Sequence, residues 1–280
     1  MTTVLDVQRF KDEGRRFPML TAYDYLSARI LDEAGIPILL VGDSLGMVML
    51  GHPTTLPVTM DDMLVHAKAV SRGARQALLV GDMPFMSYQV SADEAVRNAG
   101  RFVQEGGMHA VKLEGGGPRI VEITRRLTEA GVPVMGHLGL TPQSVHTMGG
   151  FKVQGKTESQ AARISRDAKA LEEAGAFSIV LEGMPSALAG RVTKALRIPT
   201  IGIGAGPQTD GQVLVYHDFL GLTTGKAAKF VKRYANFAEE IERAAHRFAE
   251  DVRTGTFPGP EHEYSANGSS SVPHEVKYGA

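Results

Sequence analysis

The sequence predicts an α/β protein built as a closed (β/α)8 barrel, the TIM-barrel fold. Short apolar runs alternate with amphipathic helical stretches along the chain, which is typical of parallel strands joined by helices. Several helical stretches end in a glycine that stands one to three residues before the next run, as short helix-to-strand loops require. A doubly wound open sheet is the alternative architecture.

Eight apolar runs are the predicted strands. The chain between residues 203 and 212 is rich in glycine and has no helical periodicity, so we expect the last two strands to be joined without a helix. The predicted strands are Pro18–Ala22, Pro37–Gly42, Ala77–Gly81, Ala110–Leu113, Val132–Gly136, Ser178–Leu181, Thr200–Gly202 and Gln212–Tyr216.

Helices are predicted between most of these strands, and one more near each end of the chain. Thr3 can cap an N-terminal amphipathic helix that continues to about Glu13 and plugs one end of the domain. Apolar residues at steps of three and four predict a C-terminal helix over Lys226–Val252 that covers the barrel. The helices between strands are Tyr25–Ala34, Asp61–Arg75, Ala92–Glu105, Arg119–Ala130, Glu158–Ala174 and Pro185–Leu196.

The predicted domain organisation is a single catalytic barrel over residues 1–257, followed by a tail. Residues 258–280 are rich in Gly, Ser, Pro, His and Glu and contain few large apolar side chains. Such a composition cannot bury enough apolar surface to fold, so we expect a disordered tail without function.

The composition excludes several classes of protein. With 30 basic against 31 acidic side chains, the chain lacks the charge excess that marks partners such as nucleic acid or an anionic membrane. The absence of cysteine excludes disulfides, thiolate metal sites, iron–sulfur clusters and cysteine nucleophiles. The start of the chain has no basic region followed by an apolar run, and no apolar run approaches ~18 residues. We therefore expect a cytoplasmic protein.

Polar residues gather at the predicted carboxyl ends of the strands, where barrels of this class place their active sites. Four runs end at a carboxylate, Asp43, Asp82, Glu114 or Glu182, which a buried strand would not tolerate. A helix cap or a solvent contact explains any single one of them, but the four together indicate one site. The other polar residues and glycines at strand ends are Tyr23, Asp24, Ser44, Lys112, His137, Gly202–Gly206, His217 and Asp218.

Three of these carboxylates form a candidate metal site. Asp43, Asp82 and Glu114 offer oxygen ligands in a chain without cysteine, which suits a hard divalent cation such as Mg²⁺. Magnesium usually keeps some waters, so one or more of the three is expected to act through water. Glu182 lies on a different strand and could serve as a general base from across the barrel mouth. A surface or helix-start carboxylate is the alternative for Glu182.

The remaining candidates have open roles. Lys112 lies two residues before Glu114 and so faces the same side of its strand. It could be a Schiff-base nucleophile, an anchor for a substrate carboxylate or a salt-bridge partner, and a nearby metal favours the anchor. His137 is a candidate accessory residue with a structural role as the alternative. Gly202–Gly206 could approach an anion through its backbone, and the aperiodic range Thr141–Thr157 is a candidate lid.

Many short motifs of the chain are similar, in the same order, to those of one enzyme family. From about Thr2 to Phe257 the sequence resembles ketopantoate hydroxymethyltransferase. So many colinear motifs are far more specific than one glycine-rich loop. The motifs are Thr21–Tyr25, Val41–Met47, Gly51–His52, Thr55–Thr59, Asp82–Met86, Val111–Gly116, Gly136–Ser144, Gly202–Gly206 and Thr209–Gln212.

The resemblance implies an enzyme of pantothenate and coenzyme A biosynthesis. Its reaction would transfer a hydroxymethyl group from 5,10-methylenetetrahydrofolate to 3-methyl-2-oxobutanoate, giving 2-dehydropantoate through a magnesium-stabilised enolate. The resemblance also implies a (β/α)8 barrel, dependence on Mg²⁺ and assembly into a homodecamer. Its partners would be small-molecule substrates and further copies of the chain.

The resemblance assigns roles to the candidate residues by motif. Asp43 and Asp82 would bind magnesium, Glu114 would be associated with the metal through water, and Glu182 would accept the substrate proton. Ser44 and Lys112 would hold the carboxylate of the oxoacid. The residues in contact with substrate would thus be Asp43, Ser44, Asp82 and Lys112.

Three rival interpretations remain at this point. A magnesium-dependent lyase or mutase of the phosphoenolpyruvate mutase and isocitrate lyase kind would share the barrel and an enolate, but such enzymes commonly carry a catalytic-loop cysteine, which this chain lacks. A class I aldolase would use Lys112 as its nucleophile. A binding protein on a decayed barrel would have lost the carboxylates at the strand ends, and all of them are present.

Overall fold

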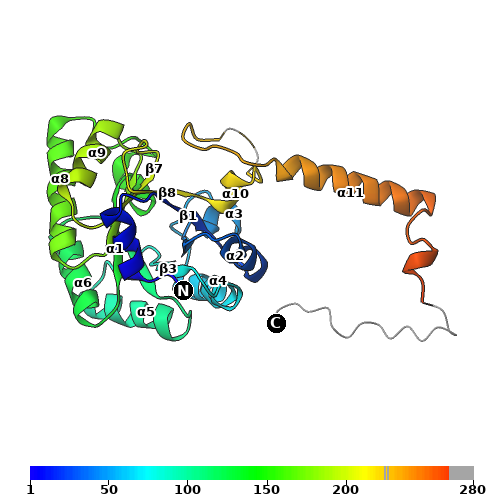
Figure 1. Ribbon diagram of the computed structural model, residues 1–280, viewed down its shortest axis with the longest axis horizontal. Coiled ribbons are helices and arrows are strands. Elements are labelled where there is room, and N and C mark those ends of the chain that lie inside the picture. Colours follow the sequence, from blue (N-terminus) through cyan, green and yellow to red (C-terminus); the bar gives the residue numbers. More distant parts are fainter. Residues whose placement is uncertain (224, 226, 265–280) are drawn as a thin grey trace. The chain divides into compact units, whose positions relative to one another are not determined.

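The computed structural model, which describes residues 1–223, 225 and 227–264, contains a closed parallel barrel (Figure 1). Its strands pair in chain order, and the last strand pairs with the first. The predicted barrel is confirmed, and the open-sheet alternative is wrong. The strands are β1 Phe17–Thr21, β2 Ile38–Val41, β3 Leu78–Asp82, β4 Ala110–Glu114, β5 Val134–Gly139, β6 Ser178–Glu182, β7 Thr200–Ile203 and β8 Gly211–Leu214.

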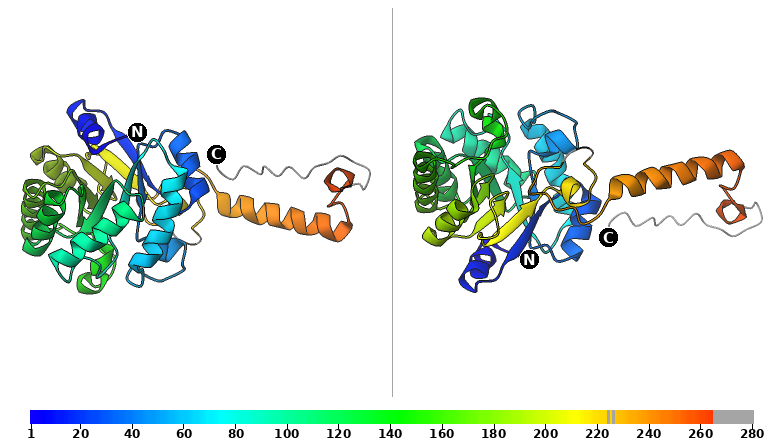
Figure 2. Two further views of the ribbon diagram at one scale, coloured as in Figure 1. Left: turned by 90° about the horizontal axis from the view of Figure 1, so that it is seen from below. Right: turned by 90° about the horizontal axis from the view of Figure 1, so that it is seen from above.

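Helices surround the barrel between successive strands (Figure 2). Four short segments were not predicted, because one helical turn is too short to show a period in the sequence. They are α3 Leu45–Val48, the 3₁₀ turn η1 Pro142–Ser144, α7 Val145–Met148 and α10 Tyr216–Phe219. The predicted helices are α2 Tyr25–Glu33, α4 Met60–Gly73, α5 Ala92–Gln104, α6 Pro118–Glu129, α8 Glu158–Glu173 and α9 Ser186–Ala195.

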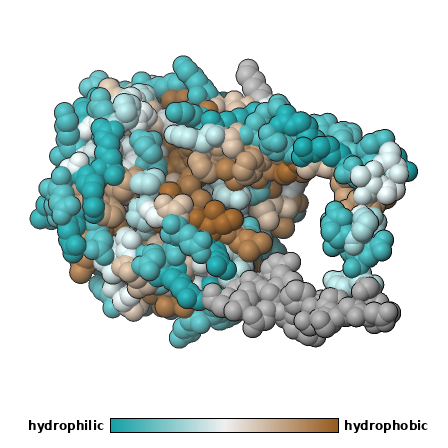
Figure 3. Space-filling model, turned by 45° about the vertical axis from the view of Figure 1, so that its right-hand side comes forward, coloured by the Kyte–Doolittle hydropathy of each residue, from teal (hydrophilic) through white to brown (hydrophobic). Residues whose placement is uncertain are grey.

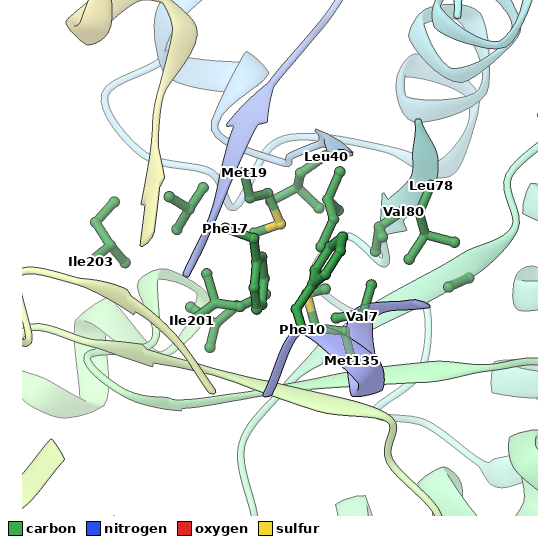
Figure 4. Close-up of a cluster of buried hydrophobic side chains, with 14 residues drawn as sticks. Val7, Phe10, Phe17, Met19, Leu40, Leu78, Val80, Met135, Ile201 and Ile203 are labelled. Carbon is green, nitrogen blue, oxygen red and sulfur yellow. The ribbon is translucent and has the colours of Figure 1, made fainter. Parts of the chain in front are cut away.

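The N-terminal helix α1, Val4–Asp12, closes the amino-terminal end of the barrel. Thr3 caps it, and the Asp6 carboxylate accepts hydrogen bonds from the Thr3 backbone in return. Val7 and Phe10 join the cluster of buried side chains inside the strands (Figure 4). The Phe10 and Phe17 ring centroids lie 5.3 Å apart. The predicted plug is therefore present.

The connection from β7 to β8 contains no helix, as predicted. Side chains replace the missing helix, because Asp210 accepts a hydrogen bond from the Thr200 N–H at 2.8 Å. The same carboxylate pairs with Lys11 of α1 at 2.8 Å. The motif Thr209–Gln212 thus holds the end of the barrel together rather than serving the chemistry.

The chain after β8 divides between two compact units. Residues 228–231 belong to the barrel unit, whereas the described residues of 217–227 and of 232–264 belong to a second unit. The second unit contains α11, Phe237–Thr254, and the 3₁₀ turn η2, Pro260–His262. No helix in the described part of the chain is long and apolar enough to cross a membrane.

The C-terminal helix begins later than predicted. The predicted first residue, Lys226, lies outside the described residues, and residues 227–236 are not helical. Tertiary contacts compete with the helix here, because the Tyr234 N–H donates to the Phe219 carbonyl at 2.9 Å and the two rings pack together. No residue of α11 is buried, so the covering role stays a prediction. The predicted tail is described only to residue 264, and 265–280 lie outside the described residues.

Apolar side chains remain on the surface of the barrel unit. Figure 3 shows one face of the molecule on which apolar surface gathers in patches between polar regions. Side chains of α2 and of α3 with its following turn are among the exposed apolar residues, and they are Leu26, Ile30, Met47, Met49 and Leu50. Exposed apolar surface of this kind often marks a contact with another chain.

Candidate active site

The structure brings the acidic strand ends together at the carboxyl-terminal mouth of the barrel. Asp82, Glu114 and Glu182 are the last residues of β3, β4 and β6, and Asp43 follows the end of β2. Asp43, Asp82 and Glu114 are all buried. Parallel strands in register place their last residues at one rim, which is why residues far apart in the sequence meet here.

Lys112 is the cation nearest to this cluster. Its Nζ lies 2.6 Å from Asp82 Oδ1, and both side chains are almost fully buried. Burial alone would lower the pKa of Lys112, but the charges of Asp82, Glu114 and Asp43 outweigh burial and raise the pKa. Lys112 is therefore a fixed positive charge.

Asp43 and Asp82 are neighbours with raised pKa values. The Asp43 N–H donates to Asp82 Oδ2 at 3.3 Å. Burial raises the pKa of Asp43 well above its usual value, and repulsion from Asp82 and Glu114 adds to this effect. Burial also raises the pKa of Asp82, although Lys112 opposes it. The fold thus holds several carboxylates where their negative charges are costly.

Gln143 links the carboxylates, and the sequence analysis assigned it no role. Its Nε2 donates to Asp43 Oδ2 at 3.0 Å and to the Met83 carbonyl at 2.9 Å. Its backbone N–H donates to Glu114 Oε2 at 2.9 Å, so one residue positions two carboxylates. Gln143 lies inside the quoted motif Gly136–Ser144, which was the available signal.

Tyr88 is a second positioning residue that sequence reasoning missed. Its hydroxyl donates to Gln143 Oε1 at 2.7 Å and accepts a hydrogen bond from the Glu114 N–H at 3.1 Å. The first bond fixes which end of the Gln143 amide faces Asp43. Tyr88 lies in the irregular connection after β3, where no period or motif pointed to it.

His137 of β5 lies between two glutamates. Its Nδ1 is 3.5 Å from Glu114 Oε1, and its Nε2 is 3.2 Å from Glu182 Oε2. Neither approach has hydrogen-bond geometry, so both ring nitrogens and Glu114 Oε1 lack a hydrogen-bond partner among the described residues. Burial and the charge of Lys112 would lower the pKa of His137, but Glu114 and Glu182 outweigh them and raise it to about 9.

Ser44 lies beside the cluster, at the start of α3. Its Oγ is 2.9 Å from the hydroxyl of Tyr23, which lies two residues after the end of β1. Asp24, by contrast, caps α2 by accepting a hydrogen bond from the Ser27 N–H at 2.8 Å. Asp24 therefore has a structural role, the alternative that its residue type allowed.

Two other groups of strand-end candidates have structural contacts. A Cβ atom at Gly204 would lie 2.9 Å from the Phe230 ring, and one at Gly206 would collide with Ser186. These glycines therefore permit close packing, and the anion contact expected for Gly202–Gly206 stays a prediction. Asp218 accepts a hydrogen bond from Thr223 at 2.7 Å within the second unit.

The carboxylates fit a divalent cation in their charge. Asp43, Asp82 and Glu114 share the single ammonium group of Lys112, and burial makes their negative charges unfavourable. Among the described residues, no group of three or more Asp, Glu or His side chains is placed so that it could hold a metal ion by itself. A cation here would therefore need water or substrate oxygens as well, which is how Mg²⁺ is usually bound. Glu114 Oε1, buried without a hydrogen-bond partner in the described chain, can accept from such a water.

Comparison with known proteins identifies the family. A sequence model described as ketopantoate hydroxymethyltransferase matches residues 1–260. The chain belongs to the ketopantoate hydroxymethyltransferase family. It is 58% identical over 263 residues to the 3-methyl-2-oxobutanoate hydroxymethyltransferase of Syntrophotalea carbinolica, covering 94% of this chain and 98% of that protein. It is 59% identical to the enzyme of the same name from Syntrophus aciditrophicus, covering 92% and 94% of the two chains.

Solved structures of other enzymes share the fold of this family member. Phosphonopyruvate hydrolase in complex with oxalate and Mg²⁺ superposes with a TM-score of 0.60 at 16% sequence identity, covering 95% of this chain and 93% of that chain. A 2,3-dimethylmalate lyase of the phosphoenolpyruvate mutase and isocitrate lyase superfamily gives 0.57 at 17%, covering 95% and 93%. At such identities the likeness establishes the barrel fold and nothing more.

A cavity of about 1050 Å³ lies next to the ends of β4 and β5 in this family member, and Asp43, Asp82, Glu114 and Glu182 are not among the described residues that line it. The range Thr141–Thr157, expected to be a lid, forms η1, α7 and a following irregular stretch, and much of it lines the cavity. Gly115 and Gly139 also line it; Gly115 directly follows Glu114, and Gly139 pairs with Glu182 in the barrel. The cavity therefore lies at the same end of the barrel as the buried carboxylates, beside the ends of β4 and β5.

Proposed function

We propose that this chain transfers a hydroxymethyl group from 5,10-methylenetetrahydrofolate to 3-methyl-2-oxobutanoate, giving 2-dehydropantoate for pantothenate biosynthesis. The family match over residues 1–260 supports the reaction. The observation that carries the chemistry is the buried set of Asp43, Asp82 and Lys112 with Glu182 nearby. Such a set can bind an oxoacid and remove a proton next to its ketone.

The proposed metal is Mg²⁺, with Asp43 and Asp82 as its protein ligands and Glu114 acting through water. When bound, the metal would supply a Lewis acid that stabilises the negative charge developing on the ketone oxygen of the oxoacid. The raised pKa values of both aspartates, caused mainly by burial, support a cation at this place.

Glu182 is the proposed proton acceptor for C3 of the oxoacid. Its side chain is 16% exposed, against 3% for that of Glu114, so a substrate in the barrel mouth can reach it. The His137 ring beside Glu182 restricts the orientation of the carboxylate and is the accessory residue. Water adds to the methylene carbon of the donor as its bonds to N5 and N10 break, and the two protons of water go to these nitrogens, so that tetrahydrofolate leaves. The C3 carbanion equivalent then forms a bond to the released carbonyl carbon, and the oxygen of that carbon takes the proton held by Glu182 to become the hydroxyl group.

Lys112 and Ser44 are the proposed contacts for the substrate carboxylate. Because its neighbouring carboxylates raise the pKa of Lys112, the side chain stays an ammonium group and suits the anchor role. A Schiff base would need the neutral amine, so the aldolase interpretation is disfavoured. The lyase interpretation rests on fold likeness at 16–17% identity, whereas the transferase rests on 58% identity over nearly the whole chain.

Assembly and location remain proposals of the same kind. The exposed apolar side chains on α2 and α3 support a homo-oligomer, and the resemblance suggests a decamer, which sedimentation of the full chain would test. The expected cytoplasmic location stays a prediction.

One assay tests the proposed function directly. The full chain is mixed with 3-methyl-2-oxobutanoate and 5,10-methylenetetrahydrofolate, with and without Mg²⁺, and 2-dehydropantoate is measured. We expect product only with both substrates and the metal. Product that is insensitive to chelation would contradict the proposed metal dependence, and covalent trapping of the oxoacid on Lys112 by borohydride would favour the class I aldolase.

A further inference from the structure

The cavity beside the ends of β4 and β5 has features that the chemistry of the buried carboxylates does not use. Its volume of about 1050 Å³ is at the upper end of the ~300–1,000 Å³ typical of small-molecule pockets. The oxoacid has only a few heavy atoms and is served by Asp43, Asp82 and Lys112. The cavity therefore has room for a second and much larger ligand.

Asp167 of α8 is the most informative residue of the cavity wall. Within the described part of the chain its carboxylate forms no hydrogen bond and no ion pair, and only longer-range interactions with Arg163 and Arg166 affect it. Burial raises the pKa of Asp167 despite these two arginines. The two carboxylate oxygens of this half-buried residue are thus available to accept hydrogen bonds from a ligand in the cavity.

The backbone makes room for this carboxylate. A Cβ atom at Gly116 would lie 2.5 Å from the Asp167 Cβ and 2.8 Å from Leu138 Cδ2. Any larger residue would push α8 away from the loop after β4. The glycine therefore places Asp167 at the wall of the cavity, near the residues that follow Glu114.

The chemistry around the rest of the cavity is amphipathic. Leu138 and Ile164 are buried apolar lining residues, whereas Lys152 and Lys156 are exposed on the loop before α8. No ion pair involves either lysine among the described residues. A ligand with a flat polar ring, an apolar middle and an anionic end would match these three kinds of surface.

We propose that this cavity binds the pteridine one-carbon donor, with Asp167 accepting hydrogen bonds from N3–H and the 2-amino group of the pterin and with Lys152 and Lys156 facing the glutamate carboxylates. The two adjacent N–H donors of a 2-amino-4-oxopteridine match the two oxygens of one carboxylate. The inference rests on the proposed function and adds the residues that recognise the donor.

The test separates the two substrates kinetically. In Asp167→Asn one acceptor becomes a donor that faces the pterin N–H groups, so we expect the KM for 5,10-methylenetetrahydrofolate to rise about tenfold or more. The KM for the oxoacid and the donor-free exchange of its C3 proton for deuterium should stay within about twofold of wild type, since Asp167 lies outside that site. Glu173→Gln, an exposed carboxylate change on the same helix, is the matched control.

A second variant tests the anionic end of the donor. Wild type should have a lower KM for the triglutamate than for the monoglutamate of methylenetetrahydrofolate, and the double variant Lys152→Ala/Lys156→Ala should lose this difference. An unchanged donor KM in Asp167→Asn, or an equal rise for both substrates, overturns the assignment. Failure of the proposed function is distinct, because wild type itself would then show neither C3 exchange nor product.

Discussion

Glu182 differs from the other carboxylates of the site in its environment. It is partly exposed and its carboxylate lies beside His137, whereas Asp43 and Asp82 are buried and held by Gln143 and Lys112. A base must reach both its substrate and, afterwards, a proton acceptor in water. Metal ligands need a fixed position instead, so the same chemical group can serve two purposes a few ångströms apart.

Replacing the proposed base tests this division of roles. Glu182→Gln should slow the exchange of the C3 proton of 3-methyl-2-oxobutanoate by about 10²–10⁴-fold, because the amide cannot accept the proton. Proton NMR in deuterated buffer with Mg²⁺ measures the exchange. Glu129→Gln, an exposed change at the end of α6, should behave as wild type. Exchange at the wild-type rate in Glu182→Gln would remove this residue from the mechanism.

Gln143 should determine how well the site holds its cation. Gln143→Leu leaves Asp43 without its amide donor and Tyr88 without its acceptor. Outer-shell changes of this kind typically weaken metal binding about 10–100-fold, so the Mg²⁺ concentration for half-maximal activity should rise by a similar factor. Gln104→Leu, at an exposed position in α5, is the control. The same Mg²⁺ dependence in both variants would show that Gln143 does not position the ligands.

At the scale of elements, buried carboxylates also tie helices to the loops between strands. Asp32 in the last turn of α2 accepts hydrogen bonds from the N–H groups of Arg75, Gln76 and Ala77 at 2.7–2.9 Å. Glu172 in α8 similarly accepts from the Ile198 N–H at 3.2 Å. Asp32 thus satisfies the backbone just before β3, and Glu172 does so before β7, which fixes where these two strands enter the barrel.

Removing one such carboxylate should destabilise the barrel strongly. Asp32→Ala leaves three N–H groups without acceptors, so we expect the free energy of unfolding to fall by about 3 kcal/mol. Chemical denaturation monitored by circular dichroism gives this value. The adjacent Glu33 pairs with Arg29 on the surface, and Glu33→Ala should unfold close to wild type. Equal stability of the two variants would contradict the structural role of Asp32.

His109, which precedes β4, should make part of the stability depend on pH. Its Nδ1 accepts a hydrogen bond from the Leu79 N–H at 3.0 Å, and burial lowers its pKa below the ordinary 6.5. The unfolded chain therefore binds the proton more tightly, so this contribution is complete above pH 6.5 and is lost as the pH falls toward the folded pKa.

A variant without the titrating ring isolates that contribution. His109→Asn keeps an acceptor near the position of Nδ1, so the stability lost between pH 7.5 and 5.5 should shrink by up to about 1.4 kcal/mol. Urea unfolding at both pH values measures the difference. The exposed His246→Asn should retain the wild-type pH dependence. A full acid loss in His109→Asn would show that other groups cause it.

At the scale of the whole molecule, periodicity and strand ends predicted the barrel well. The apolar runs lie within three residues of the observed strands, because a strand buried on both faces leaves a clear signal. The acidic ends at Asp43, Asp82 and Glu114 meet because parallel strands share a direction. The start of α11 was missed because contacts with Phe219 override the local helical pattern.

The supporting residues of the site could not be predicted in the same way. Gln143 and Tyr88 are 55 positions apart in the sequence, and Tyr88 is 26 positions from its other partner, Glu114. Only the folded chain brings these residues together. Asp32 and Asp210 are the same residue type as Asp43, yet both accept hydrogen bonds from backbone N–H groups. Asp210 also forms an ion pair with Lys11. Residue type indicates which chemistry is available, whereas burial and neighbours decide how it is used.

The short connection between β7 and β8 leaves these two strands less extensively paired than β5 and β6. Only two residue pairs register these strands, Ile201 with Gly211 and Gly202 with Gln212, whereas five pairs join β5 and β6. Because no crossover helix covers this border, we expect the barrel to open locally between β7 and β8 before it opens elsewhere. We expect backbone amides at the β7–β8 border to exchange with deuterated water faster than those at β5–β6. Equal protection of the amides at both borders would show that the ion pair of Asp210 and Lys11 stabilises the β7–β8 border as well as a crossover helix would.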